Sequence, residues 1–123
     1  MKTKTHKELI LWQKSIEFVS SIYSLTSTFP KSEIYGITSQ IRRAAVSIPS
    51  NIAEGHARHS KKELIQFLYI ALGSIAELDT QILIAKNQKF ILQDDYQKII
   101  NDLSELSKMT VSLIRYISER EKF

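Results

Sequence analysis

The sequence contains no cysteine, only two prolines and only three glycines in 123 residues. The absence of cysteine excludes disulfide bonds and thiolate zinc sites. Few glycines and prolines leave little material for hairpins or long loops, so the composition favours helices. No uncharged apolar run reaches about 18 residues, and the lysines of Met1 to Glu8 precede no long apolar segment. We therefore expect a cytoplasmic protein that neither spans a membrane nor is secreted.

The composition is that of an ordinary globular protein, but its charge is unevenly distributed. Hydrophobic residues make up 43% and charged residues 24% of the sequence. Its length of 123 residues suits a single domain. Residues 1–62 hold ten Lys/Arg and four Asp/Glu, a net charge of +6, whereas residues 63–123 hold seven and nine, a net charge of −2. This asymmetry suits polyanion binding at one end, pairing of the basic half of one copy with the acidic half of another, or ordinary surface charge.

Apolar residues spaced three and four apart predict amphipathic helices at about residues 9–28, 33–55, 61–87 and 94–121. The expected core stripes are Leu9, Trp12, Ile16, Val19, Tyr23 and Thr26; Ile34, Ile37, Ile41, Ala44 and Ile48; Leu64, Leu68, Ala71, Ile75, Leu78, Ile82 and Ala85; and Tyr96, Ile99, Leu103, Leu106, Thr110, Leu113 and Ile117. Ser32 and Ser60 are the expected N-caps of the second and third helices, and Glu63 completes a capping box with Ser60.

Short connections between four such helices predict an all-α, antiparallel up-down-up-down four-helix bundle, a single domain over residues 1–123. Apolar residues also flank the stripes, Phe18 and Ile22 among them. We expect part of this surplus to contact another subunit.

The second helix is unusual because its flanks carry little charge. One flank is polar and the other is small or apolar, so we interpret both as a candidate oligomer interface. Its members are Gln40, Arg43, Ala45, Val46, Ser47, Pro49, Ser50, Asn51, Ala53 and Glu54. Pro49 predicts a kink near Ala45, and in the alternative interpretation the side chains of Ser47, Ser50 and Asn51 only satisfy the backbone groups that the kink frees.

Basic residues gather at two places in and after this helix. The candidate nucleic-acid-binding residues are Arg42, Arg43, His56, Arg58, His59, Lys61 and Lys62. Arg42 and Arg43 suit a phosphate contact, an intersubunit salt bridge to Glu54 or Glu77, or a solvated pair. The later residues fit either a phosphate backbone near a helix N-terminus or an exposed loop cluster. Base stacking is less favoured, because the aromatic residues fall mostly on the expected core stripes.

No pattern in the sequence indicates an enzyme. His6 lies near the terminus, and His56 and His59 lie in a connection without the inward Glu-x-x-His ligands typical of bundle metal sites. A Gly-rich phosphate loop, a Gly-x-Ser-x-Gly elbow and a thiol nucleophile are all missing from the sequence. We predict no catalytic residues, no metal site and no cofactor.

Several segments resemble those of the bacterial four-helix-bundle proteins that are encoded in intervening sequences of 23S ribosomal RNA genes. The resemblance runs from about Leu11 to Ala85 and is most specific from Gln40 to Gly55. The segments are Leu11-Trp12-Gln13-Lys14, Ile22-Tyr23, Thr28-Phe29-Pro30, Glu33-Ile34-Tyr35-Gly36, Gln40-Ile41-Arg42-Arg43-Ala44-Ala45-Val46-Ser47-Ile48-Pro49-Ser50-Asn51-Ile52-Ala53-Glu54-Gly55, Phe67-Leu68, Ala71-Leu72-Gly73-Ser74 and Glu77-Leu78.

The resemblance implies a small cytoplasmic bundle that forms a ring-shaped homo-oligomer, a pentamer, and that is similar to the accessory proteins of diversity-generating retroelements. Those relatives bind nucleic acid and a reverse transcriptase through a basic surface. Two hypotheses follow. The first is a homo-oligomeric bundle that binds RNA or DNA, and the second is a protein-interaction scaffold or accessory subunit without affinity for nucleic acid.

Overall fold

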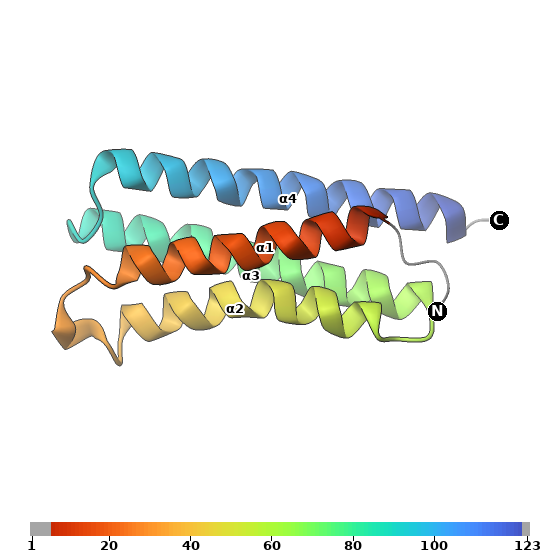
Figure 1. Ribbon diagram of the computed structural model, residues 1–123, viewed down its shortest axis with the longest axis horizontal. Helices are drawn as coiled ribbons and strands as arrows, with labels where there is room; N and C mark the ends of the chain where they lie inside the picture. The colour runs from red at the N-terminus through yellow and green to blue at the C-terminus, as the bar shows by residue number, and fades with distance from the viewer. Residues whose placement is uncertain (1–5, 122–123) are drawn as a thin grey trace.

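The computed structural model describes residues 6–121, and their regular structure is helical. The long helices are α1 (His6–Thr26), α2 (Ile37–His56), α3 (Lys61–Asn87) and α4 (Gln93–Glu121), and a short 3-10 helix, η1 (Lys31–Glu33), lies between α1 and α2. Figure 1 shows the four long helices side by side, with the chain running in alternate directions along successive helices. The described part of the chain is therefore an all-α four-helix bundle, as the sequence predicted.

The helices form a square in cross-section. α1 packs against α2 and α4, and α3 packs against the same two helices. Glu8 at the start of α1 contacts His56 at the end of α2, and Thr26 at the end of α1 contacts Arg42 near the start of α2. Because each helix contacts two of the other three, the side formed by α1 and α2 lies opposite the side formed by α3 and α4.

The ends of α3 are fixed by local hydrogen bonds. The hydroxyl of Ser60 accepts a hydrogen bond from the backbone N–H of Glu63 at 3.1 Å, so the predicted N-cap is confirmed. At the other end Lys89 adopts a left-handed conformation with a φ of 67°, and the N–H of Phe90 donates to the carbonyl of Ala85 at 3.0 Å. This is a Schellman-type ending, with lysine where glycine is usual.

The predicted start of the second helix is wrong by one turn. α2 begins at Ile37 after Gly36, whereas Ser32 lies in η1 and caps nothing. The carboxylate of Glu33 instead accepts a hydrogen bond from the N–H of Ile37 at 3.4 Å. Ile34, which the predicted stripe included, is consequently exposed in the turn before the helix.

Pro49 lies inside α2, which continues to His56. Asn51 donates from its side chain to the carbonyl of Ser47 at 2.8 Å and to the Ser47 hydroxyl at 3.1 Å. Pro49 frees the carbonyl of Ala45, four residues earlier, whereas this contact goes to Ser47, so the interpretation that polar side chains satisfy the freed backbone groups stays a prediction. The kink near Ala45 stays a prediction.

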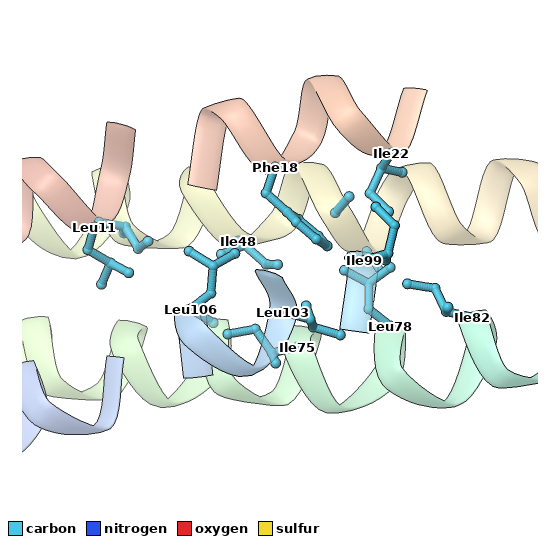
Figure 2. Packing of buried hydrophobic residues seen from close by; sticks show 14 of the residues in the cluster. Leu11, Phe18, Ile22, Ile48, Ile75, Leu78, Ile82, Ile99, Leu103 and Leu106 are labelled. Carbon is cyan, nitrogen blue, oxygen red and sulfur yellow. The ribbon is translucent and has the colours of Figure 1, made fainter. Parts of the chain in front are cut away.

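The core lies along the bundle axis and takes its side chains from all four long helices (Figure 2). All seven residues of the predicted α3 stripe are buried, and in α4 the stripe from Ile99 to Ile117 is buried while Tyr96 packs at its edge. By length and composition alone α3 could also cross a membrane. In the bundle it supplies a complete stripe to the core.

The predicted core stripe of α1 is wrong for four of its six residues, whereas Thr26 is buried and Val19 packs against the core. Leu9, Trp12, Ile16 and Tyr23 are among the exposed large hydrophobic residues. The buried side of α1 is instead formed by Glu8, Leu11, Ser15, Phe18, Ile22 and Thr26. Both sets have helical spacing, and the buried set includes polar residues, so apolar periodicity selected the wrong side of the helix.

Candidate nucleic-acid interface

The connection between α2 and α3 brings several of the predicted basic residues to one end of the bundle. α2 ends at His56 and α3 begins at Lys61, so a short turn carries Arg58 and His59 between them. The Ser60 cap fixes the first turn of α3, from which Lys62 is exposed and Lys61 is half-buried. These cations therefore surround the N-terminus of α3, where free backbone N–H groups favour anions.

His56 is tied to α1. Its Nδ1 lies 3.0 Å from a carboxylate oxygen of Glu8, whose side chain is 3% exposed. Burial of a carboxylate requires a polar partner, and His56 provides one. His56 thus helps to fix the end of α2 against the start of α1, while part of its ring stays open to solvent.

Arg58 makes two contacts within its own end of the bundle. One guanidinium nitrogen lies 2.9 Å from a carboxylate oxygen of Glu54, and the guanidinium lies over the ring of Phe67, 4.8 Å from its centroid. Its Nε is buried and has no hydrogen-bond partner among the described residues. The side chain is therefore held at the surface of the α2–α3 junction by stacking and by an ion pair.

Three further cations lie at the same end, and sequence reasoning did not include them. Lys7 Nζ and the guanidinium of Arg120 lie 4.2 Å and 4.3 Å from the centroid of the Tyr116 ring, and Arg115 is exposed on the same stretch of α4. Figure 1 shows the first turn of α1 and the last turn of α4 beside the α2–α3 connection. The expected up-down-up-down topology already placed these helix ends together, so the signal was available in the sequence.

We define the basic end as the cations and histidines that meet here. They are Lys7, His56, Arg58, His59, Lys61, Lys62, Arg115 and Arg120. The acids at this end are partly engaged within the chain: Glu8 contacts His56, Glu54 contacts Arg58, and Glu63 accepts a hydrogen bond from Ser60 at 3.1 Å. Glu119 is exposed. Among the described residues, Lys61, Lys62 and Arg115 form no ion pair, so these cations are available to an anionic ligand.

Arg42 and Arg43 do not belong to the basic end. Arg42 precedes His56 by 14 residues, or about 21 Å along a helix. The Nε of Arg42 donates to the Thr26 hydroxyl at 2.8 Å, and its guanidinium lies over the ring of Tyr23 at 4.6 Å. Arg43 is exposed. The structure therefore separates the seven predicted basic residues into two groups.

The candidate oligomer interface is also divided. Ala45 and Pro49 are buried in the core of the single chain, so neither reaches its surface. Ser47 and Asn51 are half-buried; Ser47 hydrogen-bonds to Ser74 of α3, and Asn51 to Ser47. The exposed members are Gln40, Arg43, Val46, Ser50, Ala53 and Glu54. The interface stays a prediction for these exposed residues.

The expectation that aromatic residues lie in the core holds only in part. Trp12 and Tyr23 are exposed on α1, whereas Phe29 is buried and packs against Phe90, with ring centroids 5.6 Å apart. The argument against base stacking is therefore weaker than the sequence indicated, because several aromatic residues, Tyr35 and Tyr69 also among them, are exposed at the surface.

The described residues include no group of three or more His, Asp or Glu that could hold a metal ion. A search of curated proteins gave no match. The model of the 23S rRNA-intervening sequence protein family matches residues 7–112, which is most of the chain.

The chain belongs to this family.

A solved structure supports the assignment. The chain is similar to a crystal structure of a protein with unknown function from the S23 ribosomal protein family of Bacteroides thetaiotaomicron, with 28% sequence identity and a TM-score of 0.82. The similarity covers 89% of this chain and 98% of the other. This chain and that protein therefore share the four-helix fold, and the family resemblance that the sequence indicated is confirmed.

Proposed function

We propose that this protein is a non-enzymatic, homo-oligomeric four-helix bundle that binds the backbone of RNA or DNA through the basic end. The observation that supports the proposal is the gathering of cations from α1, α3, α4 and the α2–α3 connection at one end. Lys61 and Lys62 stand in the first turn of α3, where the helix dipole disfavours cations. A phosphate group at this position would contact both lysines and the free N–H groups of the helix.

The contacts of the acidic residues at the basic end also support nucleic-acid binding there. Glu8 and Glu54 each contact a cationic or titratable group of the chain itself, so they compete less with a phosphate for the remaining cations. RNA is the first ligand to test, because the family name refers to a sequence that intervenes in 23S ribosomal RNA. We propose a cytoplasmic location and a ring of copies, with five as the subunit number that the resemblance implies.

The experiment is fluorescence polarisation with structured RNA and with duplex DNA, each at about 50 mM and about 200 mM salt. A protein that contacts several phosphates should bind at least tenfold more weakly at the higher salt concentration. The variant Lys61→Gln/Lys62→Gln should weaken binding to all sequences and lower the slope of log Kd against log salt by about 1 for each lost contact.

The matched control is Lys31→Gln/Lys89→Gln. Both lysines are exposed at the opposite end of the bundle, so this variant loses the same charge and should bind as the wild type does. Absence of binding at low salt, or an equal loss in both double variants, would contradict nucleic-acid binding by the basic end.

A second candidate function is a protein-interaction scaffold or accessory subunit, with a reverse transcriptase as one possible partner. The exposed apolar residues of α1 favour it, because an exposed apolar stripe is typical of a protein contact. This candidate predicts assembly without affinity for either nucleic acid in the polarisation experiment.

A further inference from the structure

Two apolar surfaces of the bundle have no partner within the described chain. The first, the α1/α2 apolar face, consists of Leu9, Trp12, Ile16, Tyr23 and Val46, which are 38–51% exposed. Arg42 of α2 lies over Tyr23, and Val46 follows Arg42 by one turn, so the residues from both helices share one side of the bundle. Large side chains project from this face.

The second surface is a groove between α3 and α4 with a volume of about 420 Å³. We call it the α3/α4 groove. Its lining residues are Leu72, Ile75, Ala76, Asp79, Ile100, Leu103, Ser104 and Ser107. Ala76, Ser104 and Ser107 are small, so the groove is open to side chains that enter from outside. Asp79 is an acid in its lining.

The two surfaces lie on opposite sides of the square bundle, because α1 and α2 form one side and α3 and α4 form the other. They also lie at the same height along its axis. Ser47 of α2 contacts Ser74 of α3, so in this antiparallel pair Arg42, five residues before Ser47, is level with Asp79, five residues after Ser74.

The α1 residues can be placed on the same scale. Tyr23 and Thr26 contact Arg42 and are therefore also level with Asp79. Ile16 lies seven residues before Tyr23 in α1, and Leu72 lies seven residues before Asp79 in α3. Because α1 and α3 run in the same direction and have the same rise per residue, Ile16 is level with Leu72. The part of the α1/α2 apolar face from Ile16 to Tyr23 is therefore level with the α3/α4 groove.

The charges of the two sides are complementary. Helices α1 and α2 hold four Lys/Arg and three Asp/Glu, a net charge of +1, whereas α3 and α4 hold seven and nine, a net charge of −2. When two copies stand side by side with parallel axes, Arg42 of one copy is at the height of Asp79 in the groove of the next. Opposite charges at the rim of an apolar contact favour this pairing and disfavour contact between two α1/α2 faces.

We propose that the α1/α2 apolar face of one copy packs into the α3/α4 groove of the next copy. This inference rests on the proposed homo-oligomer and names the surfaces that join its subunits. The contact is heterologous, since different surfaces of the two copies meet, and such contacts produce a closed ring when the rotation between copies closes. The groove and the part of the face that is level with it, from Ile16 to Tyr23, both lie away from the basic end.

The test uses one variant for each surface. Ile16→Glu places a charge on the exposed α1/α2 apolar face, and Ser104→Arg fills the groove; both positions lie on the exterior, so the fold should survive, which circular dichroism checks. Each variant alone should lower the mass measured by light scattering toward the 14.2 kDa chain, with at least tenfold weaker assembly.

A mixture of the two variants distinguishes this contact from others. Ile16→Glu keeps an intact groove and Ser104→Arg keeps an intact α1/α2 apolar face, so the mixture should form a 1:1 pair that cannot grow further. The control Ile84→Glu introduces a charge at an exposed residue of α3 that belongs to neither surface, and it should assemble as the wild type does.

Trp12 gives a second measurement, because it is the single tryptophan of the chain and lies on the α1/α2 apolar face. Its emission should shift to shorter wavelength when the wild type assembles, and Ser104→Arg should abolish the shift. A monomeric wild type, a mixture that stays monomeric, or an oligomer that only Ile84→Glu disrupts would overturn the inference.

Failure of this contact and failure of nucleic-acid binding give different results. If the variants dissociate as expected but the wild type binds no RNA or DNA, the subunit contact stands and the nucleic-acid proposal falls. If the wild type assembles and binds RNA while both surface variants assemble normally, the nucleic-acid proposal stands and this contact is wrong.

Discussion

A Cβ atom built on Gly55 of α2 would lie 2.8 Å from the Cβ of Phe67 on α3. Both atoms are attached directly to backbone, so neither can move aside by changing a rotamer. The absence of a side chain at Gly55 thus lets α2 and α3 approach closely at the end where the basic residues gather. In the sequence Gly55 marked only the end of a helix, yet it is a buried helical residue with an ordinary negative φ.

This contact predicts that Gly55→Ala destabilises the bundle. Alanine favours a helix over glycine by about 1 kcal/mol, but the clash with α3 should exceed that gain and give a net loss of about 1–3 kcal/mol. Urea unfolding measures the change. Gly73→Ala is the matched control, because a Cβ at Gly73 has no atom within 4 Å, and it should stabilise by about 0.5–1 kcal/mol.

The side of α1 that faces the core is tested by two identical substitutions. Ile22 is 0% exposed and Ile16 is 41% exposed, so Ile22→Ala should cost about 2–5 kcal/mol of unfolding free energy through a core cavity. Ile16→Ala should stay within about 0.5 kcal/mol of the wild type in the dissociated chain. Unfolding at two protein concentrations separates any contribution from assembly. A larger loss of unfolding free energy for Ile16→Ala than for Ile22→Ala would indicate that the predicted stripe, and not the observed one, faces the core.

Lys89→Gly is expected to stabilise the protein. Lys89 has a φ of 67°, a left-handed conformation that costs a residue with a side chain about 1 kcal/mol. Glycine avoids that cost but is more flexible in the unfolded chain, so the net gain should be about 0.5 kcal/mol. Thermal unfolding would show a higher Tm. Gln88→Gly, at the preceding residue with a φ of −81°, is the control and should lower it.

Arg42 is expected to contribute to stability through its contact with Thr26. The hydrogen bond between them is 2.8 Å long and joins α1 to α2. A double-mutant cycle with Arg42→Ala and Thr26→Val should give a coupling free energy of about 1 kcal/mol in urea unfolding. A coupling of zero would mean that this hydrogen bond adds nothing to stability, which would leave the contact with the Tyr23 ring as the interaction of Arg42 within the bundle.

Several elements could be predicted from local sequence because local interactions decide them. The Ser60 cap requires only Glu63 three residues later, and the α3 stripe from Leu64 to Ala85 keeps its three-and-four spacing over that whole length. Arg58, Lys61 and Lys62 gather at a helix junction because α2 ends at His56 and α3 begins at Lys61.

The second helix could be predicted only in outline. Its buried centre, with Ile41, Ala44 and Ile48, was correct, but its start depended on the η1 turn and on the hydrogen bond from the N–H of Ile37 to the carboxylate of Glu33. A serine followed by a glutamate is a common N-cap signal, and the sequence alone does not reveal that the chain makes an extra turn first.

What the sequence determined by itself is the class and the content of this bundle: four helices, a core stripe in α3 and α4, a capped α3, and a basic junction before it. Only the tertiary structure decided which side of α1 faces the core, since α1 carries apolar residues on two sides and burial depends on the neighbours it meets. The tertiary structure likewise placed Lys7 over the ring of Tyr116 and Arg42 over the ring of Tyr23. Contacts between residues far apart in the chain depend on how the helices pack, and periodicity within one helix cannot report them.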